Sequence, residues 1–104
     1  SGHEIADAFY AADATAVGEG ESGPPVDRKG IEAYMIENTE AERSCVMTVV
    51  DRIRHSGNFA SAYVAAHCPE TKPAEHREAR MFLVFKKEQK GWRVTQEMFI
   101  WGSF

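Results

Sequence analysis

The sequence predicts an α+β domain in which a long, strongly curved antiparallel sheet wraps around helices. Its second half alternates between segments rich in Val, Ile, Phe, Tyr, Thr and Trp and short polar turns, as consecutive strands do. An earlier segment carries apolar residues at helical spacing. With 104 residues, 43% of them hydrophobic, the chain is long enough for one core and too short for two. We therefore expect a single domain over residues 1–104.

The second half is expected to form four consecutive strands, which are Arg43–His55, Asn58–Cys68, His76–Lys87 and Trp92–Trp101. The turns between them are Ser56-Gly57, Pro69–Pro73 and Glu88–Gly91, because glycine and proline punctuate strands at such places. A sheet of this length closes one side of a pocket when helices cover it.

The first half is expected to supply those helices. Ile5–Ala12 is apolar on one side and resembles the last two turns of a longer helix. Ala14–Gly18 is a short expected strand, and Glu19–Pro25 is the loop that follows it. Asp27 is the expected N-cap of a second helix, for which Gly30–Glu42 has the helical spacing.

Alternation gives each strand two faces. The apolar face, which we expect to be concave and covered by helices, comprises Cys45, Met47, Val49, Asp51, Ile53, Ala60, Val64, Ala66, Cys68, Ala79, Met81, Leu83, Phe85, Trp92, Val94, Gln96 and Met98. The opposite face mixes Phe59, Tyr63, Arg80, Phe82, Glu97, Phe99 and Trp101. Because partner surfaces are enriched in aromatic residues and Arg, we expect a homodimer that packs through this convex face.

Cys45 and Cys68 are the only two cysteines. If Ser56-Gly57 is a two-residue hairpin loop, they face each other with Cα atoms about 5.5 Å apart, a distance that permits a disulfide. The alternative, which the sequence favours, is two reduced cysteines packed as small apolar residues.

Charge and hydropathy limit the partners. The net charge is −4 and the basic residues are scattered, whereas a nucleic-acid surface is positive, so no nucleic-acid partner is expected. No apolar run approaches the length of about 20 residues that spans a bilayer, and no secretory segment opens the chain. We expect no membrane partner and a cytoplasmic location.

Three segments carry a resemblance to a known family: Phe9–Ala14, Gly23–Pro25 with Arg28–Tyr34, and Lys90–Val94. In this order they resemble the nuclear transport factor 2-like superfamily, and within it the SnoaL-like and ketosteroid isomerase-like proteins. The resemblance implies a cystatin-like fold with a cone-shaped cavity, and a first helix that is truncated here. That fold hosts isomerases, dehydratases, hydrolases, cyclases and non-catalytic binding domains, so the resemblance implies no single activity.

Asp51 is the carboxylate that alternation places on the apolar face. Desolvation there would raise its pKa and make it a general base. The alternative is that Asp51 lies at the sheet rim, or that a bulge turns it outward toward Arg52 or Arg54. Tyr10 resembles the tyrosine of a ketosteroid isomerase oxyanion hole, which donates to a ligand oxygen. Its alternative is a core residue with the hydroxyl at the rim, and the same two interpretations apply to Tyr34.

Gln96 and two histidines complete the polar candidates. Gln96 stands where SnoaL-like proteins often place a histidine, and an amide cannot transfer a proton at neutral pH. His67 and His76 flank a turn and, with Glu75 or Glu78, suggest a surface metal site. Because no metal-ligand spacing accompanies them, solvated histidines are the expected outcome, with no metal and no cofactor.

The sequence thus predicts a small-molecule-binding protein whose ligand is a small hydrophobic molecule. The first alternative is a cofactor-independent isomerase, dehydratase or hydrolase, with Asp51 as base and Tyr10 or Gln96 polarising a substrate oxygen. The second is a dimerisation module whose cavity is filled by its own side chains. The expected lining comprises Tyr10, Tyr34, Met35, Met47, Val49, Asp51, Val64, Met81, Leu83, Trp92, Gln96 and Met98.

Overall fold

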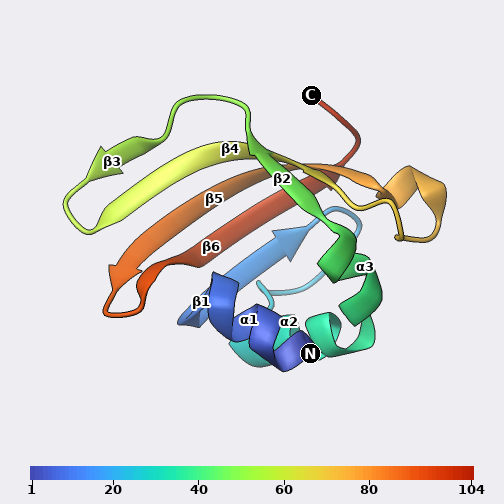
Figure 1. Cartoon of the computed structure of the whole chain (residues 1–104), viewed down its shortest axis with the longest axis horizontal. Coiled ribbons are helices and arrows are strands. Elements are labelled where there is room, and N and C mark those ends of the chain that lie inside the picture. The colour runs from blue at the N-terminus through green and yellow to red at the C-terminus, as the bar shows by residue number, and fades with distance from the viewer.

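A computed structural model describes all residues from Ser1 to Phe104 and has a curved sheet with helices on its concave side (Figure 1). The helices are α1 (Gly2–Phe9), α2 (Arg28–Glu37) and α3 (Thr39–Ser44), with one 3₁₀ turn, η1 (Ala74–His76). The strands are β1 (Tyr10–Gly18), β2 (Val46–Val49), β3 (Arg54–Ser56), β4 (Phe59–His67), β5 (Glu78–Glu88) and β6 (Gly91–Trp101). None of the helices has the length and apolar character needed to cross a membrane.

The sheet follows the order β1-β6-β5-β4-β2, and β3 pairs with the other end of β4. Neighbours among β4, β5 and β6 are antiparallel, whereas β1 runs parallel to β6 at the edge. The sheet is therefore mixed. The predicted α+β class and the curved sheet around helices are confirmed, and the parallel edge strand is an addition that alternation along single segments does not reveal.

The predicted strand Arg43–His55 is wrong as a single element. Its first residues end α3, and the ladder is interrupted between β2 and β3. Val46 pairs with His67 on one side of the interruption, and His55 pairs with Ala60 on the other. The register therefore differs by two residues across positions 50–53, and this segment bulges out of the sheet.

Cys45 and Cys68 form a disulfide, with Cα atoms 4.0 Å apart, so the favoured expectation of reduced cysteines is wrong. The hairpin turn is Gly57-Asn58 rather than Ser56-Gly57, because Ser56 pairs with Phe59. The two-residue change of register at positions 50–53 compensates for the shifted turn, so the two cysteines lie opposite each other. The bond ties the α3–β2 junction to the end of β4. Because disulfides persist mainly in oxidising compartments, it does not favour the expected cytoplasmic location.

Helices α1 and α2 begin at residues whose side chains cap them. Asp27 accepts a hydrogen bond from Gly30 N at 3.0 Å, so the predicted N-cap of α2 is confirmed. The predicted helix Gly30–Glu42 is divided at Asn38, where ψ is 29°, into α2 and α3. Helix α1 packs tightly on α2, since a Cβ on Gly2 would lie 2.5 Å from the Ile36 backbone. This close approach places α1 across the start of β1.

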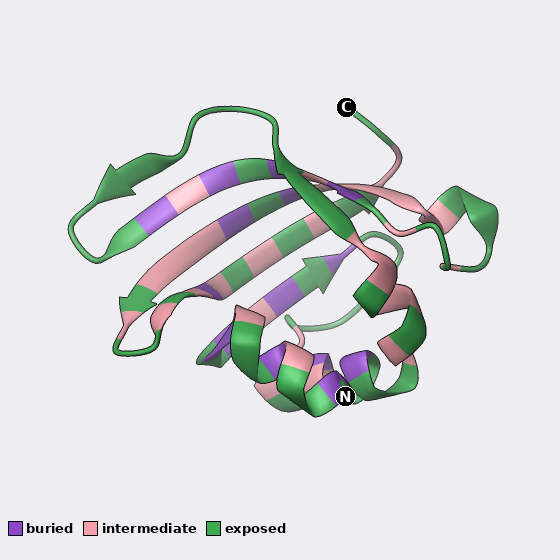
Figure 2. Ribbon diagram, viewed as in Figure 1, coloured by how far each residue is buried: buried purple, intermediate pink, exposed green.

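The core lies between the concave face and the helices, where Figure 2 shows the buried residues of β4 and β5 alternating with partly or fully exposed ones. Half-buried Arg28 fixes β1 to this layer by donating to the carbonyl oxygens of Tyr10 at 3.0 Å and Ala11 at 3.1 Å. The buried cluster comprises Ala6, Tyr10, Ala14, Ala16, Ile31, Met35, Ala62, Val64, Ala66, Met81, Leu83 and Val94.

Candidate functional site

Strand β6 carries one extra residue, Thr95, and this bulge decides which side chains face the helices. Phe85 pairs with Val94, but the preceding residue, Val84, pairs with Gln96, so Thr95 has no opposite residue. A single extra residue reverses the alternation beyond it. The inward residues are Val94 before the bulge and Glu97, Phe99 and Trp101 after it. The prediction that Gln96 and Met98 face inward, and that Glu97, Phe99 and Trp101 face outward, is wrong for this reason.

Asp13 of β1 holds the bulge in place. Its Oδ1 accepts a hydrogen bond from the Thr95 hydroxyl at 3.1 Å, and its Oδ2 lies 3.0 Å from Lys86 Nζ. The Lys86 hydrogen bond, helped by that of Thr95, lowers the pKa of the Asp13 carboxyl. Asp13 lies in the stretch of β1 where pairing with β6 is also irregular. The Asp13 carboxylate thus links the irregular stretch of β1 to the bulge at Thr95 in β6.

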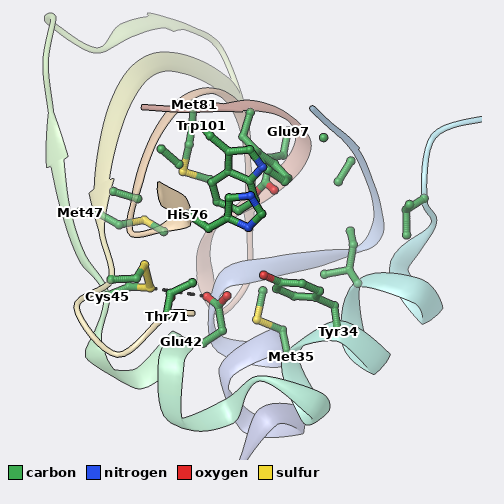
Figure 3. A pocket seen from close by; sticks show the side chains of 18 of the residues that line it. Tyr34, Met35, Glu42, Cys45, Met47, Thr71, His76, Met81, Glu97 and Trp101 are labelled. Atoms are coloured by element: carbon green, nitrogen blue, oxygen red, sulfur yellow. Dashed lines mark hydrogen bonds between the residues drawn. A yellow bond between two sulfur atoms is a disulfide. The ribbon is translucent and has the colours of Figure 1, made fainter. Parts of the chain in front are cut away.

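A pocket of about 250 Å³ opens between the concave face, α2, α3 and η1 (Figure 3). Of its 22 lining residues, 14 are hydrophobic. Residues from both edges of the sheet line the pocket: β1 and β6 form one side, and β2, β4 and β5 form the other. The lining comprises Tyr10, Ala16, Gly18, Glu21, Val26, Gly30, Ile31, Tyr34, Met35, Glu42, Cys45, Met47, Ala66, Cys68, Thr71, His76, Arg77, Ala79, Met81, Glu97, Phe99 and Trp101.

Glu97 and Tyr10 form a hydrogen-bonded pair in this pocket. The Tyr10 hydroxyl donates to Glu97 Oε1 at 2.7 Å, and Tyr10 is 5% exposed. Desolvation raises the pKa of Glu97 to about 7, assisted by Glu42 and Glu21 and opposed by the Tyr10 hydrogen bond. Burial and the neighbouring Glu97 carboxylate raise the pKa of the Tyr10 hydroxyl. Glu97 can therefore change its protonation state near neutral pH, while Tyr10 remains protonated.

The helical side of the pocket brings Tyr34 and Glu42 together, and Figure 3 shows the Tyr34 hydroxyl pointing toward the Glu42 carboxylate. Desolvation raises the pKa of Glu42. Burial, and then Glu42, Glu97 and Glu21, raise the pKa of Tyr34. Glu42 Oε2 also lies 3.8 Å from the Cys45 sulfur, so the disulfide lies beside this carboxylate. The pocket thus holds two partly desolvated carboxylates from different elements.

The outer wall is aromatic and comes from η1 and the end of β6. His76 stacks on Trp101, with ring centroids 4.1 Å apart and planes 7° from parallel. The rings of Phe99 and Trp101 pack edge to face, with their centroids 4.9 Å apart. Arg77 follows η1, and its Nε donates to the Thr71 carbonyl oxygen at 2.9 Å, which fixes the preceding loop. The structure therefore places His76 in the pocket wall, where it is stacked on Trp101 and not fully solvated as expected.

The predicted site residues divide into two groups. The pocket brings together Tyr10, Tyr34, Met35, Met47 and Met81. The residues that do not line it are Val49, Asp51, Val64, Leu83, Trp92, Gln96 and Met98. Val64 and Leu83 belong to the closed core, and Gln96 and Met98 lie on the outer face because of the bulge. Trp92 and Val49 lie farther along the sheet. There the rings of Trp92 and His55 pack edge to face, with their centroids 5.5 Å apart.

Asp51 lies in the bulged segment between β2 and β3 and is exposed. Its carboxylate accepts hydrogen bonds from Arg54 Nη1 at 2.9 Å and from Arg52 N at 2.7 Å. The Arg54 bond, followed by the Arg52 bond, lowers the pKa of Asp51. The expectation of a desolvated carboxylate with a raised pKa is wrong, and the alternative of a bulge that turns Asp51 outward is confirmed.

The surface metal site considered for His67 and His76 is not present, because the two side chains have different partners. His67 Nδ1 is hydrogen-bonded to Glu78 Oε1 across the β4–β5 ladder, while His76 stacks on Trp101. No group of three His, Cys, Asp or Glu side chains is arranged to hold a metal ion.

Four pocket residues are not predicted from the sequence: Glu97, Glu42, Trp101 and His76. Alternation that continues unbroken through Thr95 places Glu97 and Trp101 on the convex face. Gln96 and Glu97 are both polar, and the residues from Met98 to Trp101 are all apolar, so this stretch contains no alternation from which the phase can be read. Two adjacent polar residues inside a strand are the available sign that a bulge was present.

Comparison with known proteins identifies the fold. No family model and no curated protein sequence matches the chain. An NTF2-like protein of unknown function from Silicibacter pomeroyi is similar in structure, with a TM-score of 0.71 at 15% identity, covering 96% of this chain and 79% of that one. A second NTF2-like protein of unknown function, from Methylobacillus flagellatus, has a TM-score of 0.69 at 19% identity, with coverages of 99% and 78%.

A de novo designed protein with a curved β-sheet is also similar, with a TM-score of 0.66 at 11% identity, covering 95% of this chain and 85% of that one. The chain therefore has the nuclear transport factor 2-like fold, and the predicted resemblance is confirmed at that level. The narrower resemblance to SnoaL-like and ketosteroid isomerase-like proteins stays a prediction. Because a designed protein shares this shape, the shape alone defines no activity.

The raised pKa of Glu97 predicts how stability depends on pH. Since the folded-state pKa is about 7 and lies above the ordinary value of 4.5, the folded chain holds its proton more tightly than the unfolded chain does. The Glu97 contribution is therefore fully favourable below pH 4.5 and is lost as pH rises through 7. Glu97→Gln should remove this loss and raise the free energy of unfolding at alkaline pH by about 1–3 kcal/mol relative to wild type.

Urea denaturation of both proteins on either side of neutrality measures this difference. Glu37→Gln, an exposed position on α2, is the matched control and should leave the pH dependence unchanged. A Glu97→Gln protein with the same pH dependence as wild type would contradict the desolvation of Glu97.

Proposed function

We propose that the protein binds a small, mostly apolar organic molecule in the pocket between the sheet and α2 and α3. The observation that carries the proposal is a concave, largely apolar site with a few polar groups at fixed positions, which is the usual composition of a small-molecule site. A volume of 250 Å³ accommodates about a dozen non-hydrogen atoms. The three lining methionines, Met35, Met47 and Met81, can adapt their shape to such a molecule.

Filling the pocket should abolish binding. Ala79 lines it from β5, so Ala79→Phe should occupy the space without adding charge. We expect 2-naphthol to shift the amide resonances of pocket residues in the ¹H–¹⁵N NMR spectrum of wild type, and to bind Ala79→Phe at least about tenfold more weakly.

The matched control is Ala74→Phe, which adds the same side chain at an exposed position of η1 outside the lining. It should bind as wild type does. Shifts scattered over the outer surface, or equal affinity in Ala79→Phe, would contradict binding in this pocket.

A second candidate function is catalysis with Glu97, in place of Asp51, as the general base. It is favoured by one observation: a carboxylate with a pKa of about 7 faces an apolar pocket. A base of this kind suits a cofactor-independent isomerase or dehydratase that abstracts a proton beside a carbonyl group. The Tyr10 hydroxyl already donates a hydrogen bond to Glu97, so it positions the base and does not serve as a free donor to substrate oxygen.

Isomerisation of 3-cyclohexen-1-one to the conjugated enone, followed by ultraviolet absorbance, tests this candidate. We expect kcat/KM to increase with pH through about 7 as Glu97 ionises. Glu97→Gln should reduce the rate by at least about a hundredfold, and Asp51→Asn should leave it unchanged. A rate that is insensitive to Glu97→Gln would exclude Glu97 as the base.

We further propose that two copies of this chain pack through the convex face of the sheet. Tyr63, Phe82 and Met98 lie opposite one another on consecutive strands and are exposed, so they form an apolar row across β4, β5 and β6. Along the same face of β5, Glu78 and Lys86 stand on opposite sides of Phe82. A two-fold axis at Phe82 would therefore bring Glu78 close to Lys86 of the partner subunit.

Phe82→Glu should place two carboxylates at this axis and convert a dimer into a monomer. Sedimentation equilibrium at micromolar concentration measures the change, and Gln89→Glu, in the exposed β5–β6 turn, is the control that should remain dimeric. A monomeric wild-type protein, or a dimeric Phe82→Glu protein, would rule out this interface.

A further inference from the structure

The pocket contains more acidic than basic side chains, and this excess points to the charge of its ligand. We propose that the pocket takes an organic cation: a protonated amine carried on a small apolar body. The inference rests on the proposed binding function and adds the ligand's chemical class to it. The contacts of the carboxylates, the composition of the walls and the lack of a metal-like arrangement support it in turn.

The pocket carboxylates lack the cationic partners that several other carboxylates of the chain have. Three carboxylates outside the pocket each lie within 3.0 Å of a basic nitrogen. The pairs are Asp7 with Arg28, Asp13 with Lys86, and Asp51 with Arg54. Glu21, Glu42 and Glu97 line the pocket and form no ion pair. Glu21 is exposed, whereas Glu42 and Glu97 are partly desolvated, which makes their unpaired charge more costly. The two carboxylates whose pKa desolvation raises are thus both without a counter-ion.

The charged and titratable groups facing Glu97 come from every element around the pocket. They are Tyr10 from β1, Glu21 from the following loop, Tyr34 from α2, Glu42 from the end of α3, and His76 with Arg77 at η1. Only Arg77 is a permanent cation, and its Nε is already bonded to the Thr71 carbonyl oxygen. With the three glutamates ionised and His76 neutral, the lining carries a net charge of −2.

An ammonium group would supply the missing counter-charge. It donates up to three hydrogen bonds, and bonds between charged partners are about twice as strong as neutral ones. Glu97 accepts one bond from Tyr10 through Oε1, which leaves Oε2 available to a ligand. Because a nearby cation favours the ionised carboxylate, amine binding should lower the pKa of Glu97 below its value of about 7 in the free protein.

The rest of the pocket suits the apolar body of such a ligand. Met35 and Met81 lie in the buried part, and Trp101, Phe99 and Tyr34 contribute aromatic surface. The faces of aromatic rings attract cations, so these residues can contact the charged group as well as the body. Figure 3 shows Tyr34 and Glu42 on one side of the space and Trp101 with His76 on the other, with room between them for a ligand that contacts both.

A metal ion is a poorer match than an amine. A divalent cation needs several oxygen or nitrogen ligands that converge on one point. The pocket carboxylates do not converge in this way, since no group of three His, Cys, Asp or Glu side chains is arranged to hold a metal. An organic cation needs no such convergence, because its charge and its apolar body are recognised by different walls.

The test compares 2-phenylethylamine with 2-phenylethanol, two probes of nearly equal size that differ in charge. Calorimetric titration at about pH 8 and about 150 mM salt keeps the amine protonated and Glu97 largely ionised, while it screens the general attraction of an acidic protein for cations. We expect the amine to bind at least about tenfold more tightly than the alcohol. This ratio should fall at about pH 5.5, where Glu97 is protonated.

The variant Glu97→Gln should reduce amine affinity about tenfold and leave alcohol affinity unchanged, because the amide retains the volume and the acceptor of the side chain. Glu37→Gln removes the same charge from the exposed face of α2 and should change neither affinity. Equal binding of both probes, or equal losses in the two variants, would overturn the inference while the proposed binding function stands. If neither probe bound, nor 2-naphthol, the inference and the proposed function would both fail.

Discussion

The structure of the pocket depends on the bulge at Thr95 in β6. Without this extra residue, Gln96 and Met98 would face the helices and Glu97 would lie in solvent on the convex face. With it, Glu97 reaches Tyr10, and Trp101 reaches His76 at the outer wall. Asp13 joins the bulge to the irregular stretch of β1 through Thr95 and Lys86, so the edge strand and the bulge maintain each other. One inserted residue thus determines the chemistry of the concave face.

The pocket combines features that oppose stability with elements that hold it open. Desolvated carboxylates at Glu97 and Glu42 destabilise the ionised folded chain, and the cavity lacks the packing that a filled core provides. The Cys45–Cys68 disulfide, the Arg28 hydrogen bonds to β1 and the Arg77 hydrogen bond to the η1 loop fix the surrounding elements. Groups that are unfavourable in the empty protein and become favourable with a partner present are typical of binding sites.

The architecture could be predicted from the sequence further than the site could. Strand segments, the Asp27 cap and the fold resemblance depend on local patterns, which a single chain displays. The incorrect predictions concern which face of the sheet a side chain lies on. A bulge at positions 50–53 turns Asp51 outward, and another at Thr95 turns Glu97 inward. The bulge at Thr95 is stabilised by a residue distant in sequence, since Asp13 contacts both Thr95 and Lys86, so local alternation does not reveal it. The sequence predicts Tyr10 and Met35 correctly because Tyr10 precedes the irregular stretch of β1 and Met35 lies on a helix.

The reversal of phase at Thr95 is the central claim, and nuclear Overhauser contacts in solution test it most directly. With the Tyr10 hydroxyl 2.7 Å from Glu97 Oε1, the Glu97 side-chain protons should show contacts to the Tyr10 ring, and those of Gln96 should show none. Contacts from Gln96 to the Tyr10 ring, with Glu97 in contact only with convex-face residues such as Phe82, would contradict the account. The pocket would then lose the desolvated carboxylate of Glu97 and, with it, the reason to expect a cationic ligand.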